Sequence, residues 1–270
     1  MPYAETPSGR IYCESHGEGP ALLIAPSFGA TTRTYRGILP NLTETHRVLL
    51  YDPAGMGQSD DLSVDPTLAS MADDVAAVLD HFGVDRASVM GMSMGAIIAQ
   101  KFAALHRARL DRLVLITPPA KKTQHGDAVN ELLGDLFKAC EPNRFMRHML
   151  HLALSPDFVN RHPRVVEQIA HGMDVAPRDA ETMARLVESV NRFTGVDGLD
   201  GMDAPTLIIA GALDIFTPPS HARALQAQLP CCQLIVMDDV AHTPFIERAK
   251  ETFAAVKLFL NGGSPVGPTD

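Results

Sequence analysis

Short apolar runs that alternate with helical patterns constrain the fold of this chain more than any other feature of its 270 residues. Six runs of four or five residues are rich in aliphatic side chains, and they occupy residues 21–25, 48–51, 87–90, 113–116, 206–210 and 233–237. Runs of this length are typical of strands that are buried on both faces. Between several of the runs, apolar residues recur every three or four positions, as they do in helices. The alternation predicts an α/β fold with a mostly parallel sheet and helices on both of its faces.

A long interval without strand-like runs separates residue 117 from residue 204, and it carries only helical patterns punctuated by prolines. We therefore expect a core made of residues 1–120 and 200–260, and a helical cap or lid over one end of the sheet at residues 121–199. Residues 261–270 hold three Gly and two Pro, and we expect them to form a flexible tail.

The segment Gly91-Met92-Ser93-Met94-Gly95 lies directly between the run 87–90 and a helical pattern. A serine on a strand-to-helix turn this tight needs neighbours without bulk, and the turn lifts its hydroxyl clear of the sheet. The N–H of Met94 then points from a helix N-terminus towards developing negative charge. The segment predicts that Ser93 is a nucleophile and that Met94 contributes to an oxyanion hole. The alternative is a chance helix start made of small residues.

A serine nucleophile needs a base to take its proton and a third group to orient that base. Asp214 follows the run 206–210 and His242 follows the run 233–237. Ligands bind at the carboxyl edge of open α/β sheets, and the order Ser, Asp, His is that of one hydrolase architecture. We therefore predict a catalytic triad of Ser93, Asp214 and His242.

Three segments of the sequence resemble motifs of one known family: Gly-Met-Ser-Met-Gly, Gly-Ala-Leu-Asp-Ile-Phe-Thr-Pro and Ala-His-Thr-Pro-Phe-Ile-Glu. In order and spacing they resemble the α/β-hydrolase fold superfamily, over about residues 10–260. The resemblance implies an eight-stranded type of sheet with residues 121–199 as its cap. The glycine-rich stretch 51–60 is also similar to a turn of this family, although Ala54 and Met56 stand where many members have Arg and His.

The loop after the run 21–25 contains Ser27-Phe28-Gly29 and is similar to that of enol-lactonases and related esterases. The resemblance implies that the N–H of Phe28 joins that of Met94 in the oxyanion hole. We expect Ser27, Gly29 and Met92 to contact the substrate. The Ser27 hydroxyl is either an extra donor to the substrate or a cap for the turn at Gly29.

Other titratable residues offer weaker alternatives. The segment after the run 113–116 has no carboxylate to replace Asp214, and Asp238 and Asp239 lie too close to His242 in the sequence to face it across a site. His148 and His151 are three residues apart on one helical pattern, but a packed or solvated pair is the stronger interpretation without a third ligand. Nothing resembles a phosphate loop or a dinucleotide motif, so we expect no metal and no cofactor.

Charge and composition exclude several classes of partner. With 23 Lys and Arg against 32 Asp and Glu, the chain lacks the basic stripe that a nucleic-acid groove needs. The four cysteines fit neither a disulfide framework nor a zinc site. No run approaches the roughly 18–20 apolar residues that cross a bilayer, and the first residues do not read as a signal peptide. We expect a cytoplasmic protein with a small-molecule substrate and no membrane or nucleic-acid partner; the sequence does not indicate its oligomeric state.

The leading functional hypothesis is a serine hydrolase that cleaves a carboxylic ester or lactone through an acyl-enzyme on Ser93. The residues of the 121–199 interval favour an apolar or small neutral acyl substrate over a polyanion. A C–C bond hydrolase, a lyase or a cofactor-free perhydrolase would use the same triad. A ligand receptor without catalysis is the alternative from another class.

Overall fold

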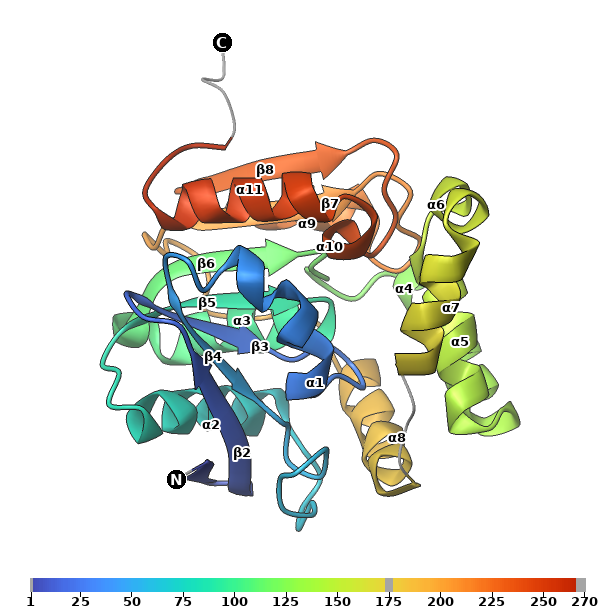
Figure 1. The fold of residues 1–270 in the computed structure, drawn as a ribbon, viewed down its shortest axis with the longest axis horizontal. Coiled ribbons are helices and arrows are strands. Elements are labelled where there is room, and N and C mark those ends of the chain that lie inside the picture. The colour runs from blue at the N-terminus through green and yellow to red at the C-terminus, as the bar shows by residue number, and fades with distance from the viewer. Residues whose placement is uncertain (1, 173–176, 266–270) are drawn as a thin grey trace.

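The computed structural model of the chain describes residues 2–172 and 177–265, and within them eight strands form one sheet in the order β1-β2-β4-β3-β5-β6-β7-β8 (Figure 1). The strands are β1 (Tyr3–Thr6), β2 (Gly9–His16), β3 (Ala21–Ala25), β4 (Arg47–Tyr51), β5 (Ala87–Met92), β6 (Leu110–Ile116), β7 (Thr206–Gly211) and β8 (Cys232–Met237). The pairs β1–β2 and β2–β4 are antiparallel, and every other pair is parallel. The six apolar runs are β3 to β8, so the predicted α/β sheet is confirmed.

Helices cover both faces of the sheet, which explains why the strands are continuously apolar. On β3, Leu23 and Ala25 pack into a core shared with the helices α2 and α3, whereas Leu22 and Ile24 pack into a second core shared with α11. The core helices are α1 (Thr32–Tyr35), η1 (Arg36–Asn41), α2 (Leu68–His81), α3 (Met94–Leu105), η2 (Arg107–Arg109), α9 (Pro219–Gln228), α10 (Pro244–Glu247) and α11 (Ala249–Leu260).

Helices occupy the interval between β6 and β7. Its described part contains α4 (Gln124–Ala139), α5 (Pro142–Ala153), α6 (Pro156–Arg161), α7 (Pro163–Gly172) and α8 (Pro177–Asn191). These helices lie beyond the carboxyl ends of the parallel strands (Figure 1). Of the predicted flexible tail, residues 266–270 lie outside the described residues, as do residues 173–176 of the predicted cap.

The strand order creates one place where loops diverge at the carboxyl edge of the sheet. From β3 the chain passes to β4 on one side, and it then returns to β5 on the other side of β3. The loop after β3 and the turn after β5 therefore flank a crevice of the kind where open α/β sheets bind ligands. Phe28 lies on the first segment and Ser93 on the second.

Within residues 2–172 and 177–265, none of the helices combines the length and the hydropathy needed to cross a bilayer.

Candidate active site

Ser93 occupies a strained turn between β5 and α3. Its φ of 54° and ψ of −119° lie where residues other than glycine rarely go. The turn is held because the Ser93 N–H donates to the Ile116 carbonyl at 3.0 Å. A side chain at Gly91 would overlap the backbone of Gly95, and one at Gly95 would overlap the carbonyl oxygen of Ala25. The two glycines are thus required by close backbone approach, as the motif predicts.

The structure brings the three predicted triad residues together. His242 Nε2 lies 2.8 Å from Ser93 Oγ, and His242 Nδ1 lies 2.7 Å from Asp214 Oδ2. The Asp214 side chain is fully buried, and that of His242 is 12% exposed. The serine and the carboxylate thus bind opposite nitrogens of one imidazole.

The surroundings of Asp214 keep its carboxylate ionised. It accepts hydrogen bonds from the N–H of Phe216 at 2.8 Å, from the N–H of Thr217 at 3.0 Å and from the Thr217 hydroxyl at 2.7 Å. Burial acts to raise the pKa of Asp214, but the adjacent His242 and these hydrogen bonds outweigh it and lower that pKa below its ordinary value. An ionised Asp214 accepts the Nδ1–H of His242, which leaves Nε2 of the neutral ring to accept the Ser93 proton.

A second set of contacts, which the sequence analysis missed, holds the loop that carries His242. The His242 N–H donates to the Ala153 carbonyl at 2.9 Å. Glu247 accepts the N–H of Ala241 at 3.1 Å and the N–H of Ser155 at 3.0 Å. Because Ala153 and Ser155 belong to the 121–199 interval, these bonds connect the imidazole loop to the helices above the sheet. Glu247 is the last residue of the Ala-His-Thr-Pro-Phe-Ile-Glu segment that resembles the family, and this position could have indicated a role for it in the sequence analysis.

Two threonines were also missed. Thr217 follows Asp214 by three residues, the spacing at which an Asp side chain caps a turn. Its hydroxyl oxygen also lies 3.1 Å from the Thr117 carbonyl oxygen, so this carbonyl and the Asp214 carboxylate share one hydroxyl proton. Thr117 has a φ of 47°, and its hydroxyl donates to the His242 carbonyl at 3.2 Å. The loops after β6, β7 and β8 are therefore tied together beneath the imidazole.

The backbone N–H groups of Phe28 and Met94 flank the Ser93 turn. Among the residues that the structure describes, no oxygen accepts either N–H. Both residues line the cavity that contains Ser93. Two residues of the cavity wall thus have backbone N–H groups without an acceptor in the described part of the chain.

The structure places the other three predicted contact residues away from the cavity wall. The Ser27 hydroxyl donates to the Met92 carbonyl at 2.9 Å, and Met92 is fully buried. Neither of them, nor Gly29, is among the described residues that line the cavity. The Ser27 hydroxyl thus binds a backbone carbonyl, and this bond joins the loop after β3 to the end of β5.

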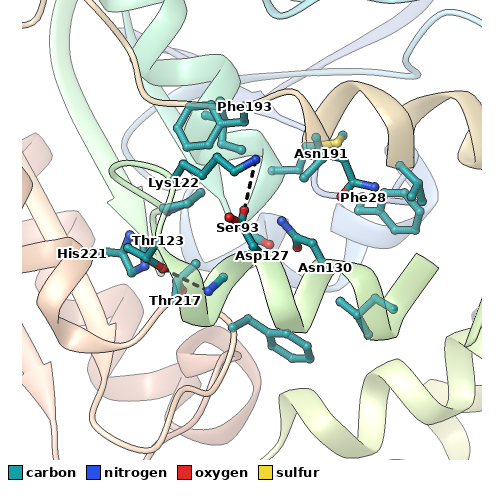
Figure 2. A pocket seen from close by; sticks show the side chains of 18 of the residues that line it. Phe28, Ser93, Lys122, Thr123, Asp127, Asn130, Asn191, Phe193, Thr217 and His221 are labelled. Atoms are coloured by element: carbon teal, nitrogen blue, oxygen red, sulfur yellow. Dashed lines mark hydrogen bonds and ion pairs between the residues drawn. The ribbon is translucent and has the colours of Figure 1, made fainter. Parts of the chain in front are cut away.

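A cavity of about 150 Å³ opens onto Ser93 and His242 (Figure 2). Much of its wall is apolar and comes from Phe28, Met94, Ile97, Leu133, Phe145, Met149, Val187, Val190, Phe193 and Phe216. Its polar wall comes mainly from Lys121, Lys122, Thr123, Asp127, Asn130, Asn191 and His221. The space suits a small ligand with an apolar body and a polar group.

Two of the alternative site residues have other partners. Asp239 forms an ion pair with Arg248, and His151 Nδ1 donates to the Arg147 carbonyl at 2.8 Å. In the described part of the chain, no group of three or more His, Cys, Asp or Glu side chains could hold a metal ion.

Comparisons with known proteins agree with this architecture. The model of the alpha/beta hydrolase fold family matches residues 20–249. The chain is 27% identical to a protein of Azorhizobium caulinodans named as the carbamate hydrolase RutD, over 90% of this chain and 91% of the relative. It is 28% identical to the pimeloyl-acyl-carrier-protein methyl ester esterase of Neisseria meningitidis, over 87% of this chain and 91% of the relative.

Among solved structures, the enol-lactonase from Burkholderia xenovorans LB400 has the same fold, with a TM-score of 0.83 at 23% identity over 96% of this chain and 100% of that one. The strand order, the strained turn at Ser93 and the family match over residues 20–249 lead to one conclusion. This chain belongs to the alpha/beta hydrolase fold family.

Proposed function

We propose that the protein is a serine hydrolase that cleaves a carboxylic ester or lactone through an acyl-enzyme on Ser93. Ser93 Oγ attacks the carbonyl carbon while its proton moves to His242 Nε2. The tetrahedral intermediate then loses the alkoxide, which takes the proton from His242. Water attacks the acyl carbon as His242 takes one of its protons. The acid leaves when that proton returns to Ser93 Oγ, so the cycle consumes one water and regenerates the enzyme.

The observation that carries this proposal is the geometry of His242. Its two ring nitrogens lie 2.8 Å from Ser93 Oγ and 2.7 Å from Asp214 Oδ2. With Asp214 ionised, the imidazolium formed during attack lies beside a buried negative charge, which stabilises it. A hydroxyl with these partners is activated where an ordinary serine is not.

The negative charge that develops on the carbonyl oxygen needs donors as well. In this proposal the N–H groups of Phe28 and Met94 bind that oxygen, and Met94 adds the positive end of α3. One such donor typically lowers the barrier by about 3–4 kcal/mol. Because the hydrogen bond from Ser27 to Met92 joins the loop after β3 to the end of β5, the two donors need no rearrangement when negative charge develops on the oxygen.

We further propose that helices α4 to α8 act as a cap that determines the substrate. The cavity of about 150 Å³ lies between them and Ser93, and a space of this size accommodates a small acyl or alkyl group. A carbamate is a second candidate substrate, because the 27% identical relative from Azorhizobium caulinodans is named for that activity. Attack on a carbamate carbonyl forms the same kind of oxyanion.

The test is the Ser93→Ala variant with short-chain esters, lactones and carbamates as substrates. We expect turnover to fall by at least about a thousandfold with the melting temperature little changed, and we expect Ser264→Ala, an exposed serine near the end of the chain, to behave as the wild type. A fluorophosphonate should label the wild type once per chain and should not label Ser93→Ala. Unchanged turnover in Ser93→Ala contradicts the proposal, and a wild type that takes no label favours a non-catalytic receptor.

A further inference from the structure

Two adjacent lysines form part of the cavity wall in a chain whose formal net charge is −9. Lys121-Lys122 is the only place in the sequence where two Lys or Arg residues are neighbours. Asp127 is the one carboxylate among the described residues that line the cavity. Figure 2 shows the Lys122 side chain extending towards Asp127 at the wall of the cavity that contains Ser93. The one pair of adjacent basic residues in the sequence thus lies at the cavity.

The backbone that carries the two lysines is held at three successive positions. The Ala120 N–H donates to His221 Nδ1 at 3.0 Å, Lys121 forms an isolated β-bridge with Gly195, and the Lys122 N–H donates to the Thr194 carbonyl at 3.3 Å. These bonds hold the backbone of the two lysines at the wall of the cavity that contains Ser93 without help from a ligand. A site held in this way loses less conformational entropy when it binds.

The lysines exceed the negative charge around them. Lys122 Nζ lies 3.3 Å from Asp127 Oδ1, with both side chains about half exposed. Within residues 2–172 and 177–265, no carboxylate forms an ion pair with Lys121. Asn130 and Asn191 line the same cavity (Figure 2) and add amide donors. One uncompensated ammonium with neighbouring N–H donors is the set of groups that recognises a carboxylate.

Building on the proposed function, we propose that the substrate is a small ester or lactone that carries one carboxylate, which binds at Lys121 and Lys122. The apolar wall takes the body of this molecule, and the lysines take its charge. The excess of one positive charge suits a single carboxylate better than a polyanion. The sequence analysis favoured a neutral acyl substrate because it could not show that Lys121 and Lys122 line the cavity. The proposal of a carboxylate replaces that expectation.

The test compares esters that differ only in an isosteric carboxylate. For the acyl side, the pair is monomethyl succinate and methyl 4-methylpentanoate; for the alcohol side, it is 4-acetoxybenzoate and 4-isopropylphenyl acetate. The readout is the ratio of kcat/KM for the anionic ester to that for the neutral ester. We expect the ratio to exceed one for at least one pair, and to fall when the ionic strength is raised to about 0.5 M.

Three variants make the comparison specific. Lys122→Met should lower the ratio roughly fivefold, the size expected for one half-exposed ion pair. Asp127→Asn should raise it, because it frees Lys122 from its carboxylate. Lys138→Met removes the same charge from an exposed position of α4 that does not line the cavity, and it should leave the ratio unchanged. A wild-type ratio below one for both pairs, or no change in Lys122→Met, overturns the inference but not the proposed function.

A binding measurement separates this inference from catalysis. Benzoate and benzamide are titrated into Ser93→Ala, which needs no turnover to bind them. Benzoate should bind more tightly than benzamide. Adding Lys122→Met should lower the ratio of the benzamide Kd to the benzoate Kd roughly fivefold. Equal binding of the two ligands overturns the carboxylate site, whereas failure of the proposed function would appear as ester turnover that survives Ser93→Ala.

Discussion

The Tyr35 hydroxyl and Ser27 are joined by two hydrogen bonds: the Ser27 N–H donates to it at 2.7 Å, and it donates to Ser27 Oγ at 3.2 Å. Tyr35 is buried at 3% exposure. Since Ser27 Oγ in turn donates to the Met92 carbonyl at 2.9 Å, α1 is connected through this loop to the residue just before Ser93. The Phe28 N–H follows directly in the loop, so Tyr35 positions one of the two proposed oxyanion donors.

Tyr35→Phe should therefore lower kcat by about tenfold with little change in KM, because a displaced donor weakens binding of the oxyanion more than binding of the substrate. The variant also leaves the partly buried Ser27 N–H without its acceptor, which should reduce the free energy of unfolding by about 1 kcal/mol. Steady-state kinetics on a short ester and urea denaturation measure the two effects. Tyr3→Phe, on the edge strand β1, is the control for loss of a tyrosine hydroxyl. A rise in KM at constant kcat would mean that Tyr35 acts on substrate binding instead.

Asp214→Asn should abolish most activity and change the pH dependence of stability. The pKa of Asp214 is lowered in the folded state, so its ionised form contributes stability that is present above the unfolded pKa of about 3.9 and is lost as the pH falls below it. The wild type should exceed the variant in unfolding free energy at neutral pH, and this difference should shrink below about pH 4. Urea denaturation at a series of pH values checks the sign. A difference that grows in acid contradicts the ionised Asp214.

For Asp74 on α2 we predict the opposite effect of the ionised carboxylate on the unfolding free energy. Its side chain is buried, and Oδ1 has no hydrogen-bond partner among the described atoms. Burial raises the pKa of Asp74 despite hydrogen bonds with Ser8 and Thr6. A raised pKa means that the folded state binds its proton more tightly, so the ionised carboxylate lowers stability above its unfolded pKa of about 3.9.

Asp74→Asn should thus increase the unfolding free energy at neutral pH, with a gain that disappears in acid. The same urea series measures it, and Asp73→Asn, the more exposed neighbour on α2, serves as the control. A loss of stability at pH 7 would show that the hydrogen bonds of the carboxylate outweigh its burial.

That Ser93, Asp214 and His242 lie close together could be predicted from the sequence, because parallel strands bring their carboxyl ends to one edge of the sheet. Ser93, Asp214 and His242 each follow an apolar run, so the parallel sheet places all three at its carboxyl edge, and the loops after β7 and β8 carry Asp214 and His242 to Ser93. The α/β sheet itself follows from runs that are apolar on both faces. These inferences need only local patterns and the rule that such strands are parallel.

The supporting contacts could not be predicted, because they depend on how separate segments fold back over the sheet. Glu247 accepts the N–H of Ser155 only because the junction of α5 and α6 packs against α10, and the helical periodicity of 121–199 does not predict that placement. Tyr35 lies in a helix of four residues, too short to leave a periodic pattern. Lys121 lines the cavity because the segment at Gly195 returns beside it. Side-chain direction at Ser27 likewise depends on a carbonyl from another strand.

Two glycine substitutions compare a position that admits no side chain with one that is open. In Gly95→Ala the new methyl group would overlap the Ala25 carbonyl, so α3 must move away from the loop that carries Phe28. We expect a loss of about 3 kcal/mol or more in unfolding free energy, together with reduced ester turnover. Gly134→Ala, inside α4 with nothing within 4 Å of the added methyl, should instead stabilise the protein by about 0.5–1 kcal/mol. Urea denaturation of both variants checks the pair, and a stable, active Gly95→Ala would mean that the close approach of α3 to β3 is not needed to hold the Ser93 turn.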